Sequence, residues 1–567
     1  MSRARFVGQS ASSGTALGLL HRTELPPAVV SAPSPPSQDP VAEVTDAFDA
    51  VAEELAELSR TLRDSGQTDL ADIVEVDGYI AQDLELRGAA LQHARAEQSP
   101  AQAVVQAVDE YAALLAALDD PTLAERAADV RQVGRRVLAY LAGATSATSA
   151  TSATPDGPMV LVAQEIGAAD LLEHGDLVVA AASVIGGPNS HASIIARSLG
   201  IPLILGVSPA VLDHPDGVEA LIDADRATIT VDPDPAERLA AVAVIDAARR
   251  RREILAAERD LPSQTLDGHR VALRANVASS VEAKAANAAH ADGVGLLRTE
   301  MPFLDARKWP TEDQHAAVLA PVLGKLAGQP VTVRTLDFAD DKFPPFLADQ
   351  AVDGHLGRGL PHMLADPLAF THQFRAILST GAACDLRIMI PMVATVEELA
   401  ACAQILAAVA AEVGVAPPPI GAMIELPEAV DIADALAEQA AFFSIGSNDL
   451  TSQILRLDRR DPAVSPVLAA HPKVLQAIAH TVQAAHRRGL KVSVCGDAGA
   501  HPLVIPLLIG LGVDVLSVAP AALDETRARI RRLDARVCAE VAAEALACET
   551  LESVQGIVRR RCWPEMP

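Results

Sequence analysis

The chain has 567 residues, half of them hydrophobic, which is enough for several domains that each bury a large core. Its formal net charge of −28 and aromatic content of 3% disfavour nucleic-acid binding, which requires basic surfaces and stacking rings, and favour a basic protein partner. No apolar run reaches membrane-spanning length, and the N-terminal stretch MSRARFVGQSASSG lacks the apolar centre of a signal peptide, so we expect a cytoplasmic protein with no membrane segment.

The first half of the chain contains a helical region between two segments of linker composition. The Pro/Ser-rich stretch SAPSPPSQDP at 31–40 precedes it, and the low-complexity tract TSATSATSAT at 145–154 follows it. Between them, apolar residues recur at alternating spacings of three and four, which is typical of packed helices. The first such stripe is Val41, Val44, Phe48, Val51, Leu55, Leu58 and Leu62. We expect a helical hairpin or bundle over 40–143.

From Met159 the pattern changes to short apolar strands that alternate with helices. Strands are predicted at 160–162, 177–185 and 201–205, followed by a hairpin around Asp225. This pattern indicates a compact α/β domain, into which the helical region is inserted if the N-terminal segment supplies a strand. The expected domain limits are 1–35 with 145–235 for the α/β domain, 36–144 for the helical domain, 236–260 for a connecting helix and 261–567 for the last domain.

The last 300 or so residues repeat strand and helix over the length that a barrel requires. The eight apolar strands are predicted at 271–277, 293–298, 331–336, 386–392, 419–425, 442–447, 491–496 and 514–519. Eight strands separated by helices predict a (β/α)₈ barrel. The expected fold class is therefore α/β, with an α/β domain that carries a helical insertion and a C-terminal TIM barrel.

The segment GGPNSHASIIARSLG at 186–200 predicts a corner between a strand and a helix. Two glycines break the preceding apolar strand, Ser190 is a good N-cap, and His191 then falls in the first helical turn. The free amides and dipole at this position favour an anion and disfavour imidazolium, so a neutral imidazole is expected that could accept a phosphoryl group. A histidine that merely faces solvent is the alternative, which this segment leaves open.

Polar residues that could bind a substrate or take part in catalysis follow the predicted barrel strands. They are Arg298, Arg334, Glu425, Asn448, Asp449 and Cys495, with Arg459 in the loop after the sixth strand. Arginine forks suit phosphate and carboxylate oxygens, two carboxylates suit a hard cation such as Mg²⁺, and a thiol can deliver a proton. Any one of them could be a simple ion pair or packing residue at the barrel rim. As a set they indicate a site for a small phosphorylated carboxylate.

Ten segments together resemble one known family over nearly the whole chain. They are ERAADVRQVGRRVL (125–138), GGPNSHASIIARSLGIP (186–202), TLDGH (265–269), DGVGLLRTE (292–300), VRTLD (333–337), LRIMIPM (386–392), MIELP (423–427), FFSIGSNDLT (442–451), LDR (457–459) and CGD (495–497). On these segments the chain is similar to enzyme I of the phosphoenolpyruvate (PEP)-dependent sugar phosphotransferase system. The resemblance to pyruvate phosphate dikinase and PEP synthase is more distant.

The resemblance implies that His191 is the phosphorylated nucleophile and that Cys495 protonates the departing enolate to give pyruvate. It further implies that Glu425 and Asp449 bind Mg²⁺. The PEP-binding residues that it implies are Arg298, Arg334, Asn448, Asp449 and Arg459. A histidine-containing phosphocarrier protein is expected to dock on the helical domain and take the phosphoryl group, and the chain is expected to form a homodimer through its barrel.

The sequence departs from the family pattern at three places. Asn189 stands where the family has Thr, and Asp77 stands where a histidine is usual. The family pattern N-P-x-L-G-x-R reads DGHLGRG at 353–359, which places Arg358 one residue early, and LDFADDK replaces the glycine pair before the usual Asp-Lys. We expect Arg358 to keep its contact with the substrate phosphate, because the glycine that follows leaves the backbone adaptable.

Of two alternative functions, the sequence disfavours the first and leaves the second open. Pyruvate phosphate dikinase and PEP synthase need a further nucleotide-grasp domain, for which 40–143 is too short and too helical. The second alternative is a degenerate relative that binds PEP or the carrier as a regulator without catalysis, motivated by the irregular arginine loop. An assay of PEP consumption with purified carrier separates this alternative from the enzyme.

Overall fold

A computed structural model describes most of the chain. The described residues are 3–23, 39–64, 68–96, 99–116, 121–143, 157–187, 190–304, 306–339, 343–351, 356–457 and 465–565. By its internal contacts the chain divides into two compact units, Met1–Arg251 and Arg252–Pro567, each of which is described by itself. The helix predicted at 236–260 is α9 (Pro235–Ala257), which crosses this division.

The first unit contains an eight-stranded mixed sheet in the order β1-β8-β7-β3-β4-β5-β6-β2. Its strands are β1 (Ala4–Val7), β2 (Gln9–Ser12), β3 (Thr15–Arg22), β4 (Met159–Glu165), β5 (Val178–Ile185), β6 (Leu203–Leu205), β7 (Glu219–Asp223) and β8 (Thr228–Val231). The N-terminal segment thus supplies three strands, and β7 and β8 form the predicted hairpin around Asp225. Strands β3 and β4 pair in parallel, although the helical region separates them in the sequence.

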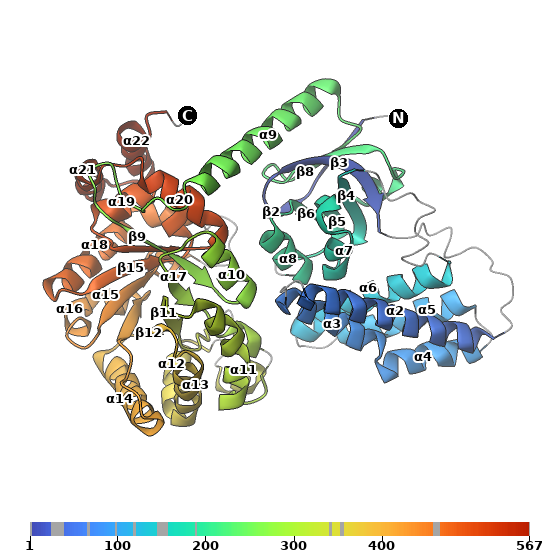
Figure 1. The fold of residues 1–567 in the computed structure, drawn as a ribbon, viewed down its shortest axis with the longest axis horizontal. Helices are drawn as coiled ribbons and strands as arrows, with labels where there is room; N and C mark the ends of the chain where they lie inside the picture. The colour runs from blue at the N-terminus through green and yellow to red at the C-terminus, as the bar shows by residue number, and fades with distance from the viewer. Residues whose placement is uncertain are drawn as a thin grey trace. The chain divides into compact units, whose positions relative to one another are not determined.

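The described residues between β3 and β4 contain five helices. They are α2 (Pro40–Asp64), α3 (Thr68–Ala81), α4 (Leu84–Arg95), α5 (Pro100–Ala116) and α6 (Pro121–Leu141). The predicted apolar stripe of α2 is largely buried, with Val44, Phe48 and Leu55 at most 1% exposed. Two short helices, α7 (Ala168–Glu173) and α8 (His191–Leu199), lie against the sheet on the side of these five helices (Figure 1).

The helical region and the sheet share one hydrophobic core. Along β4, alternate residues point to opposite faces of the sheet, because successive side chains in a strand alternate. Leu161 belongs to the same buried cluster as residues of α2 to α6, whereas Val160 and Val162 belong to the cluster on the other face. The inserted helices therefore cover one face of the sheet. The domain boundaries expected at 35/36, 144/145 and 260/261 remain predictions.

The second unit is a closed barrel of eight parallel strands, in which the last strand pairs with the first. The strands are β9 (Ala272–Val277), β10 (Val294–Leu297), β11 (Pro330–Arg334), β12 (Asp385–Ile390), β13 (Ile420–Ile424), β14 (Phe442–Gly446), β15 (Lys491–Cys495) and β16 (Val515–Val518). Every strand predicted from the sequence is present at its expected place. The TIM barrel is therefore confirmed.

Helices surround this barrel, as Figure 1 shows. They are α10 (Ser280–Ala288), α11 (Glu312–Leu323), α12 (Gly359–Ala365), α13 (Pro367–Thr380), α14 (Val396–Val413), α15 (Pro427–Asp431), α16 (Ala433–Leu436), α17 (Ser447–Leu455), α18 (Pro472–Arg487), α19 (Ile505–Gly510), α20 (Leu523–Ile530), α21 (Ala535–Leu546) and α22 (Leu551–Cys562). Helix α14 illustrates local control of its ends, since Thr395 forms a capping box with Glu398 and Gly414 ends the helix in the left-handed conformation.

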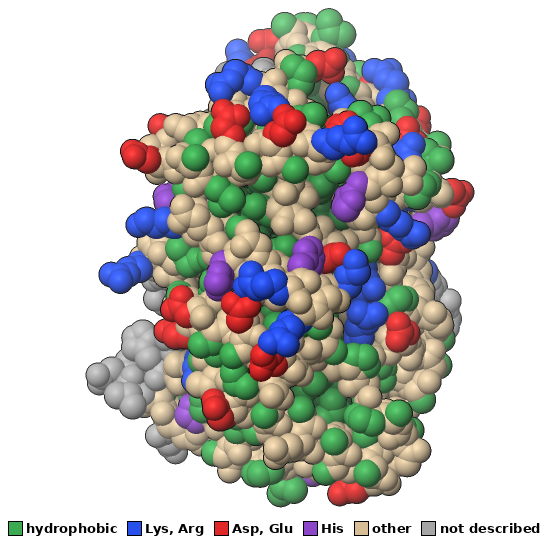
Figure 2. Space-filling view, turned by 90° about the vertical axis from the view of Figure 1, so that its left-hand side faces the viewer, with side chains coloured by type: hydrophobic (Ala, Val, Ile, Leu, Met, Phe, Trp, Pro, Cys, Tyr) green, Lys and Arg blue, Asp and Glu red, His purple; other side chains and the backbone are tan. Residues whose placement is uncertain are grey.

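Acidic and basic side chains alternate on the face drawn in Figure 2. Exposed ion pairs on the barrel helices, such as Arg487–Asp434 at 2.6 Å, mix the two signs locally. The large negative net charge is therefore not gathered into one acidic patch on this face. None of the helices among the described residues has both the length and the apolar character that crossing a bilayer requires.

The barrel contains a buried histidine that should make its stability sensitive to acid. His315 on α11 is 1% exposed, packs edge-on against the Phe303 ring, and neither ring nitrogen has a hydrogen-bond partner among the described residues. Burial, with a smaller contribution from His372, lowers the pKa of His315 to about 3. The neutral ring therefore favours the folded state above the ordinary histidine pKa, and this contribution is lost as the pH falls from that value toward 3.

We predict that His315→Leu flattens the acid side of the stability profile. Each unit of pKa difference corresponds to about 1.4 kcal/mol, so the parent should lose about 2 kcal/mol more than the variant between pH 7 and pH 5. Denaturant unfolding followed by tryptophan fluorescence reports on the barrel, because both tryptophans, Trp309 and Trp563, lie in the second unit. His269→Leu, at an exposed position, is the matched control, and equal slopes for the parent and His315→Leu would contradict the assignment.

Candidate active site

The barrel brings the predicted site residues to the end of the strands where active sites of this fold form. Arg298 directly follows β10 and Arg334 ends β11. Glu425 follows β13, Asn448 and Asp449 lie in the first turn of α17 after β14, and Cys495 ends β15. Since parallel strands end at one mouth, these six residues share it. Arg459 lies outside the described residues.

Arg334 is fixed in a buried ion cluster that the sequence did not predict. Its guanidinium contacts the Glu300 carboxylate at 2.7 Å and the Asp337 carboxylate at 2.8 Å, and all three residues are at most 4% exposed. Burial alone would lower the pKa of Arg334, but the carboxylates of Asp337 and Glu300 outweigh burial and raise it. The guanidinium therefore stays charged and is held in one orientation, which is what a substrate-binding cation requires.

Glu425 is completely buried, with one oxygen paired and the other not. Its Oε1 accepts a hydrogen bond from the Met392 amide at 2.6 Å, whereas Oε2 has no partner among the described residues. Burial, together with the nearby Asp337 and Asp449 carboxylates, raises the pKa of Glu425 well above its usual range. A carboxylate whose charge is disfavoured by its surroundings is the kind of group that a bound cation would stabilise.

The donor set at this end of the barrel suits a hard cation. Glu425 and Asp449 offer carboxylate oxygens, and the unpaired Oε2 of Glu425 is available to a ligand. Within the described part of the chain, no three His, Cys, Asp or Glu side chains form a ready-made metal site.

Cys495 lies at the end of β15 with its thiol in an apolar setting. It is 1% exposed and clusters with Leu296, Met389, Met423 and Phe442. The Ser444 hydroxyl donates to its sulfur at 3.4 Å, and the thiol donates to the Ile445 carbonyl at 3.5 Å. Burial raises the pKa of the Cys495 thiol to about 11, so that the group keeps its proton at neutral pH.

The residue after Cys495 must be glycine. Gly496 has φ of 107°, and a Cβ there would lie 2.5 Å from the Ser447 hydroxyl oxygen. The close approach lets Asn448 pair with Asp497. The side-chain amide of Asn448 donates to the Asp497 carboxylate at 3.2 Å, and the backbone N–H of Asp497 donates to the side-chain oxygen of Asn448 at 3.3 Å. The pairing of Asn448 with Asp497 was not predicted, although both residues lie in the motifs quoted above.

Arg358 lies at the start of α12 and is partly buried. Its Nη1 donates to the Met392 carbonyl at 2.9 Å and contacts the Glu398 carboxylate at 2.9 Å. Met392 follows β12, so Arg358 remains at the same end of the barrel despite its early position in the sequence. Arg298, by contrast, is exposed.

The predicted corner around His191 is confirmed in the first unit. Strand β5 ends at Ile185, and α8 begins at His191 with Ser190 as its N-cap, whose hydroxyl accepts a hydrogen bond from the Ser193 amide at 3.3 Å. Helix α8 ends at Gly200 in the left-handed conformation. The His191 side chain lies outside what the structure describes, whereas its backbone position at a helix N-terminus is clear.

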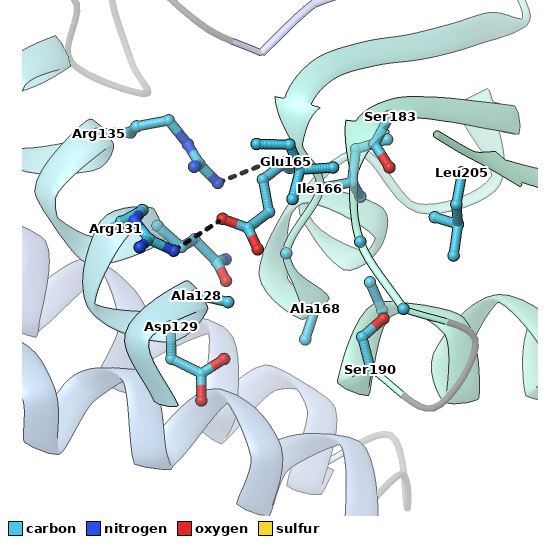
Figure 3. Close-up of a pocket in the computed structure, with 16 residues that line it drawn as sticks. Ala128, Asp129, Arg131, Arg135, Glu165, Ile166, Ala168, Ser183, Ser190 and Leu205 are labelled. Carbon is cyan, nitrogen blue, oxygen red and sulfur yellow. Dashed lines mark hydrogen bonds and ion pairs between the residues drawn. The ribbon is translucent and has the colours of Figure 1, made fainter. Parts of the chain in front are cut away.

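A pocket of about 400 Å³ lies beside this corner (Figure 3). Helix α6 forms one side of it, and the starts of α7 and α8 form the other. Arg131 and Arg135 of α6 point toward Glu165, at 3.9 Å from its carboxylate and 2.8 Å from its carbonyl oxygen respectively. Ser183 and Ser190 lie on the opposite side of the pocket.

Two buried polar groups in this pocket have no partner among the described residues. They are Nε2 of Gln132, a residue 2% exposed, and the hydroxyl of Ser183, a residue 1% exposed. Buried polar groups are usually hydrogen-bonded to protein, water or ligand, so these two groups are free to contact a molecule that enters the pocket. Gln132 lies within ERAADVRQVGRRVL, which contributed to the resemblance without a role for this residue.

Comparison with known proteins identifies the family to which this chain is similar. Sequence profiles of the PEP-utilising enzymes match three stretches: the N-terminal domain at 7–126, the mobile domain at 155–232 and the PEP-binding domain at 252–535. The phosphoenolpyruvate-protein phosphotransferase of Geobacillus stearothermophilus is 32% identical, with 98% of this chain and 97% of that protein aligned. This chain belongs to the PEP-utilising enzyme family. The family resemblance found in the sequence is thereby confirmed.

Some members of the PEP-utilising enzyme family that resemble this chain are longer. The multiphosphoryl transfer protein of Xanthomonas campestris pv. campestris is 36% identical over 98% of this chain, which spans 67% of that protein's length. The multiphosphoryl transfer protein of Rhodobacter capsulatus is 39% identical over 79% of this chain, and the alignment spans 54% of that protein. Thus the chain spans only about half to two thirds of these two relatives.

Two of the departures from the family pattern have structural outcomes. Asp77 lies on α3 and is 3% exposed, so its carboxylate is part of the helical packing rather than of an open surface. The early Arg358 contacts Met392 and Glu398. Asn189 lies outside the described residues.

Proposed function

We propose that this chain is a phosphoenolpyruvate-protein phosphotransferase. It moves the phosphoryl group of PEP to His191 and then to a histidine-containing phosphocarrier protein, and releases pyruvate, in the first step of a sugar phosphotransferase system. The observation that supports this most is the meeting of Arg334, Glu425, Asp449 and Cys495 at one barrel mouth. A positively charged side chain, ligands for a metal cation and a proton donor are the three kinds of group that enolate release from a phosphorylated carboxylate requires.

In the proposed complex, the substrate lies among the arginines at the barrel mouth. The groups that contact its phosphate and carboxylate are Arg298, Arg334, Arg358, Arg459 and Asn448, with Asp449 beside them. Arg334 is held by Glu300 and Asp337 and keeps its orientation when PEP arrives, so little ordering is needed on binding. Glu425 and Asp449 would hold Mg²⁺, which would neutralise charge at the substrate oxygens.

The chemistry exchanges one bond to phosphorus for another. The neutral imidazole of His191 attacks the phosphorus atom, a P–N bond forms, and the P–O bond to the enol oxygen breaks. The enolate then takes a proton at C3 from the thiol of Cys495, whose raised pKa keeps that proton available at neutral pH. The thiolate recovers its proton from solvent, and the phosphoryl group on His191 is passed to the carrier.

The partners follow from the same proposal. The carrier docks on the helical region and takes its phosphoryl group from His191, and two chains form a dimer through their barrels. His191 lies in the first unit and the barrel residues lie in the second, so the proposed reaction uses residues of both units. The direct test is phosphoryl transfer: a chain labelled from ³²P-PEP should pass its label to an added histidine phosphocarrier, and retention of all label on the chain would contradict the proposed second step.

We predict that Gln132→Leu slows phosphoryl transfer through His191. In the proposed site, the unpaired Nε2 of Gln132 and the hydroxyl of Ser183 donate to the phosphoryl oxygens more strongly in the transition state of transfer than in phosphorylated His191. A hydrogen bond to a charged group is worth about 1.5–3 kcal/mol, so each loss should cost about tenfold or more in the transfer rate. Quench-flow measurement of label transfer from the phosphorylated chain to the carrier gives this rate.

Two variants sharpen this test. Gly167→Ala should act like Gln132→Leu, because a Cβ at Gly167 would lie 1.8 Å from the Gln132 side-chain oxygen and would displace the amide. Gln106→Leu, on the exposed side of α5, is the matched control. A transfer rate in Gln132→Leu equal to that of the control would remove Gln132 from the site.

A further inference from the structure

We propose that Arg358 and Glu398 are a positioning pair that orients Glu425 for the divalent cation by fixing the turn after β12. This inference rests on the proposed function and deepens it. It gives Arg358 a role in addition to any contact with substrate phosphate, and it assigns a role to Glu398, which the motifs leave without one.

Met392 connects the pair to the cation site through its backbone. Its N–H donates to Oε1 of Glu425 at 2.6 Å, and its carbonyl oxygen accepts from Nη1 of Arg358 at 2.9 Å. The backbone amide of Met392 is thus hydrogen-bonded to Glu425, the proposed cation ligand, and its backbone carbonyl is hydrogen-bonded to Arg358. Any movement of this residue moves the anchor of the Glu425 carboxylate.

The backbone of Met392 adopts a conformation that neighbouring contacts must maintain. Its φ is 52°, in the left-handed region that residues with a side chain rarely adopt. Such a conformation persists when the surrounding structure fixes it, and it is concentrated at functional sites. At Met392 the surrounding contacts are those to Glu425 on one side and to Arg358 on the other.

Glu398 joins Arg358 to the start of α14. One of its oxygens accepts from the Ala394 amide at 2.8 Å, from the Thr395 amide at 3.2 Å and from Nη1 of Arg358 at 2.9 Å. The side chain is 14% exposed, and these contacts hold the pKa of Glu398 below its usual range despite burial. The Glu398 carboxylate therefore holds the end of the turn that leads into α14. Through Arg358, it also holds the Met392 carbonyl at the end of the turn that follows β12.

The consequence for the cation site is geometric. Glu425 has a single hydrogen bond, at Oε1, while Oε2 has no partner among the described residues. If the Met392 amide shifts, the carboxylate loses the contact that aims Oε2, and the cation loses one of its two proposed protein ligands. Residues that orient metal ligands in this way typically affect metal affinity strongly when they are replaced.

The test measures cation binding instead of turnover. The full-length chain carries His191→Ala, so that bound PEP is not consumed, and Mn²⁺ binding in the presence of PEP is followed by electron paramagnetic resonance. In this background, Arg358→Ala and Glu398→Gln should each weaken Mn²⁺ binding by about tenfold or more. The double variant should bind Mn²⁺ no more weakly than the single variant with the lower Mn²⁺ affinity, because both substitutions act through one contact.

Two controls separate positioning from general damage. Glu397→Gln changes the exposed neighbour of Glu398 and should leave Mn²⁺ affinity unchanged. Met392→Gly keeps the amide and the carbonyl and accepts a positive φ, so it should retain the affinity that the side-chain variants lose. Tryptophan fluorescence melts check that every variant is folded.

The outcomes are distinct. Parental Mn²⁺ affinity in Glu398→Gln would overturn the inference. Parental Mn²⁺ affinity in Arg358→Ala, measured at saturating PEP, would also overturn it and would leave Arg358 as a phosphate contact only. If the His191→Ala parent itself binds PEP but no Mn²⁺, the proposed cation site is wrong and the inference fails with it. If the parent binds neither, the proposed function is wrong.

Discussion

Replacing His191 with alanine is expected to abolish phosphorylation of the chain by PEP. The imidazole at the N-terminus of α8 is the proposed acceptor, and removing it leaves the substrate without a nucleophile. The parent, incubated with ³²P-PEP and Mg²⁺, should carry a label that is stable in base and lost in acid, as expected for a phosphohistidine. The variant should carry none.

The matched control for this experiment is a histidine in the same unit but away from the corner. His214→Ala, at a partly buried position beside the Phe6 ring, should be labelled like the parent. Label that persists in His191→Ala, or that resists acid in the parent, would assign the phosphoryl group to another residue.

Replacing Cys495 with alanine is expected to slow pyruvate formation by about 10²–10⁴, the range typical of general acid catalysis. The thiol is buried at the barrel mouth, its raised pKa of about 11 keeps it protonated, and alanine cannot supply the proton. The loss should appear in kcat rather than in the affinity for PEP, because the arginines are untouched. A coupled assay for pyruvate measures the first quantity, and equilibrium PEP binding measures the second.

Cys548→Ala provides the control for loss of a thiol elsewhere, since Cys548 is a free, partly buried cysteine between α21 and α22. The pH profile gives a second check. Because Cys495 acts in its protonated form, the rate of pyruvate formation by the parent should not rise over the pH range in which cysteines of ordinary pKa ionise. Normal turnover in Cys495→Ala would reduce Cys495 to a packing residue.

The parts of the fold that depend on local pattern could be predicted from the sequence. Each of the eight barrel strands is an apolar run between helical segments, and the corner at His191 has a glycine pair and a serine N-cap as local signals. The side chains at strand ends could also be predicted to share one mouth, because closure of a parallel barrel brings those ends together.

The remainder depends on contacts between distant parts of the sequence. Nothing near Arg334 indicates that Glu300 comes from the preceding strand's loop to pair with it, or that Met392 anchors Glu425. Likewise, the sequence predicts the helical region as an insertion in the α/β domain but does not indicate that its helices share a core with the sheet strand β4. Orphaned donors such as Gln132 Nε2 become visible only when their surroundings are known.

A single-turnover measurement of pyruvate tests the central claim most directly. The full-length chain is mixed with PEP and Mg²⁺ without carrier, and pyruvate is quantified over time. An enzyme that phosphorylates itself should release a burst of about one pyruvate per chain and then stop until a histidine phosphocarrier is added. PEP binding without any pyruvate release would contradict this account and would identify the chain as a regulator that binds PEP.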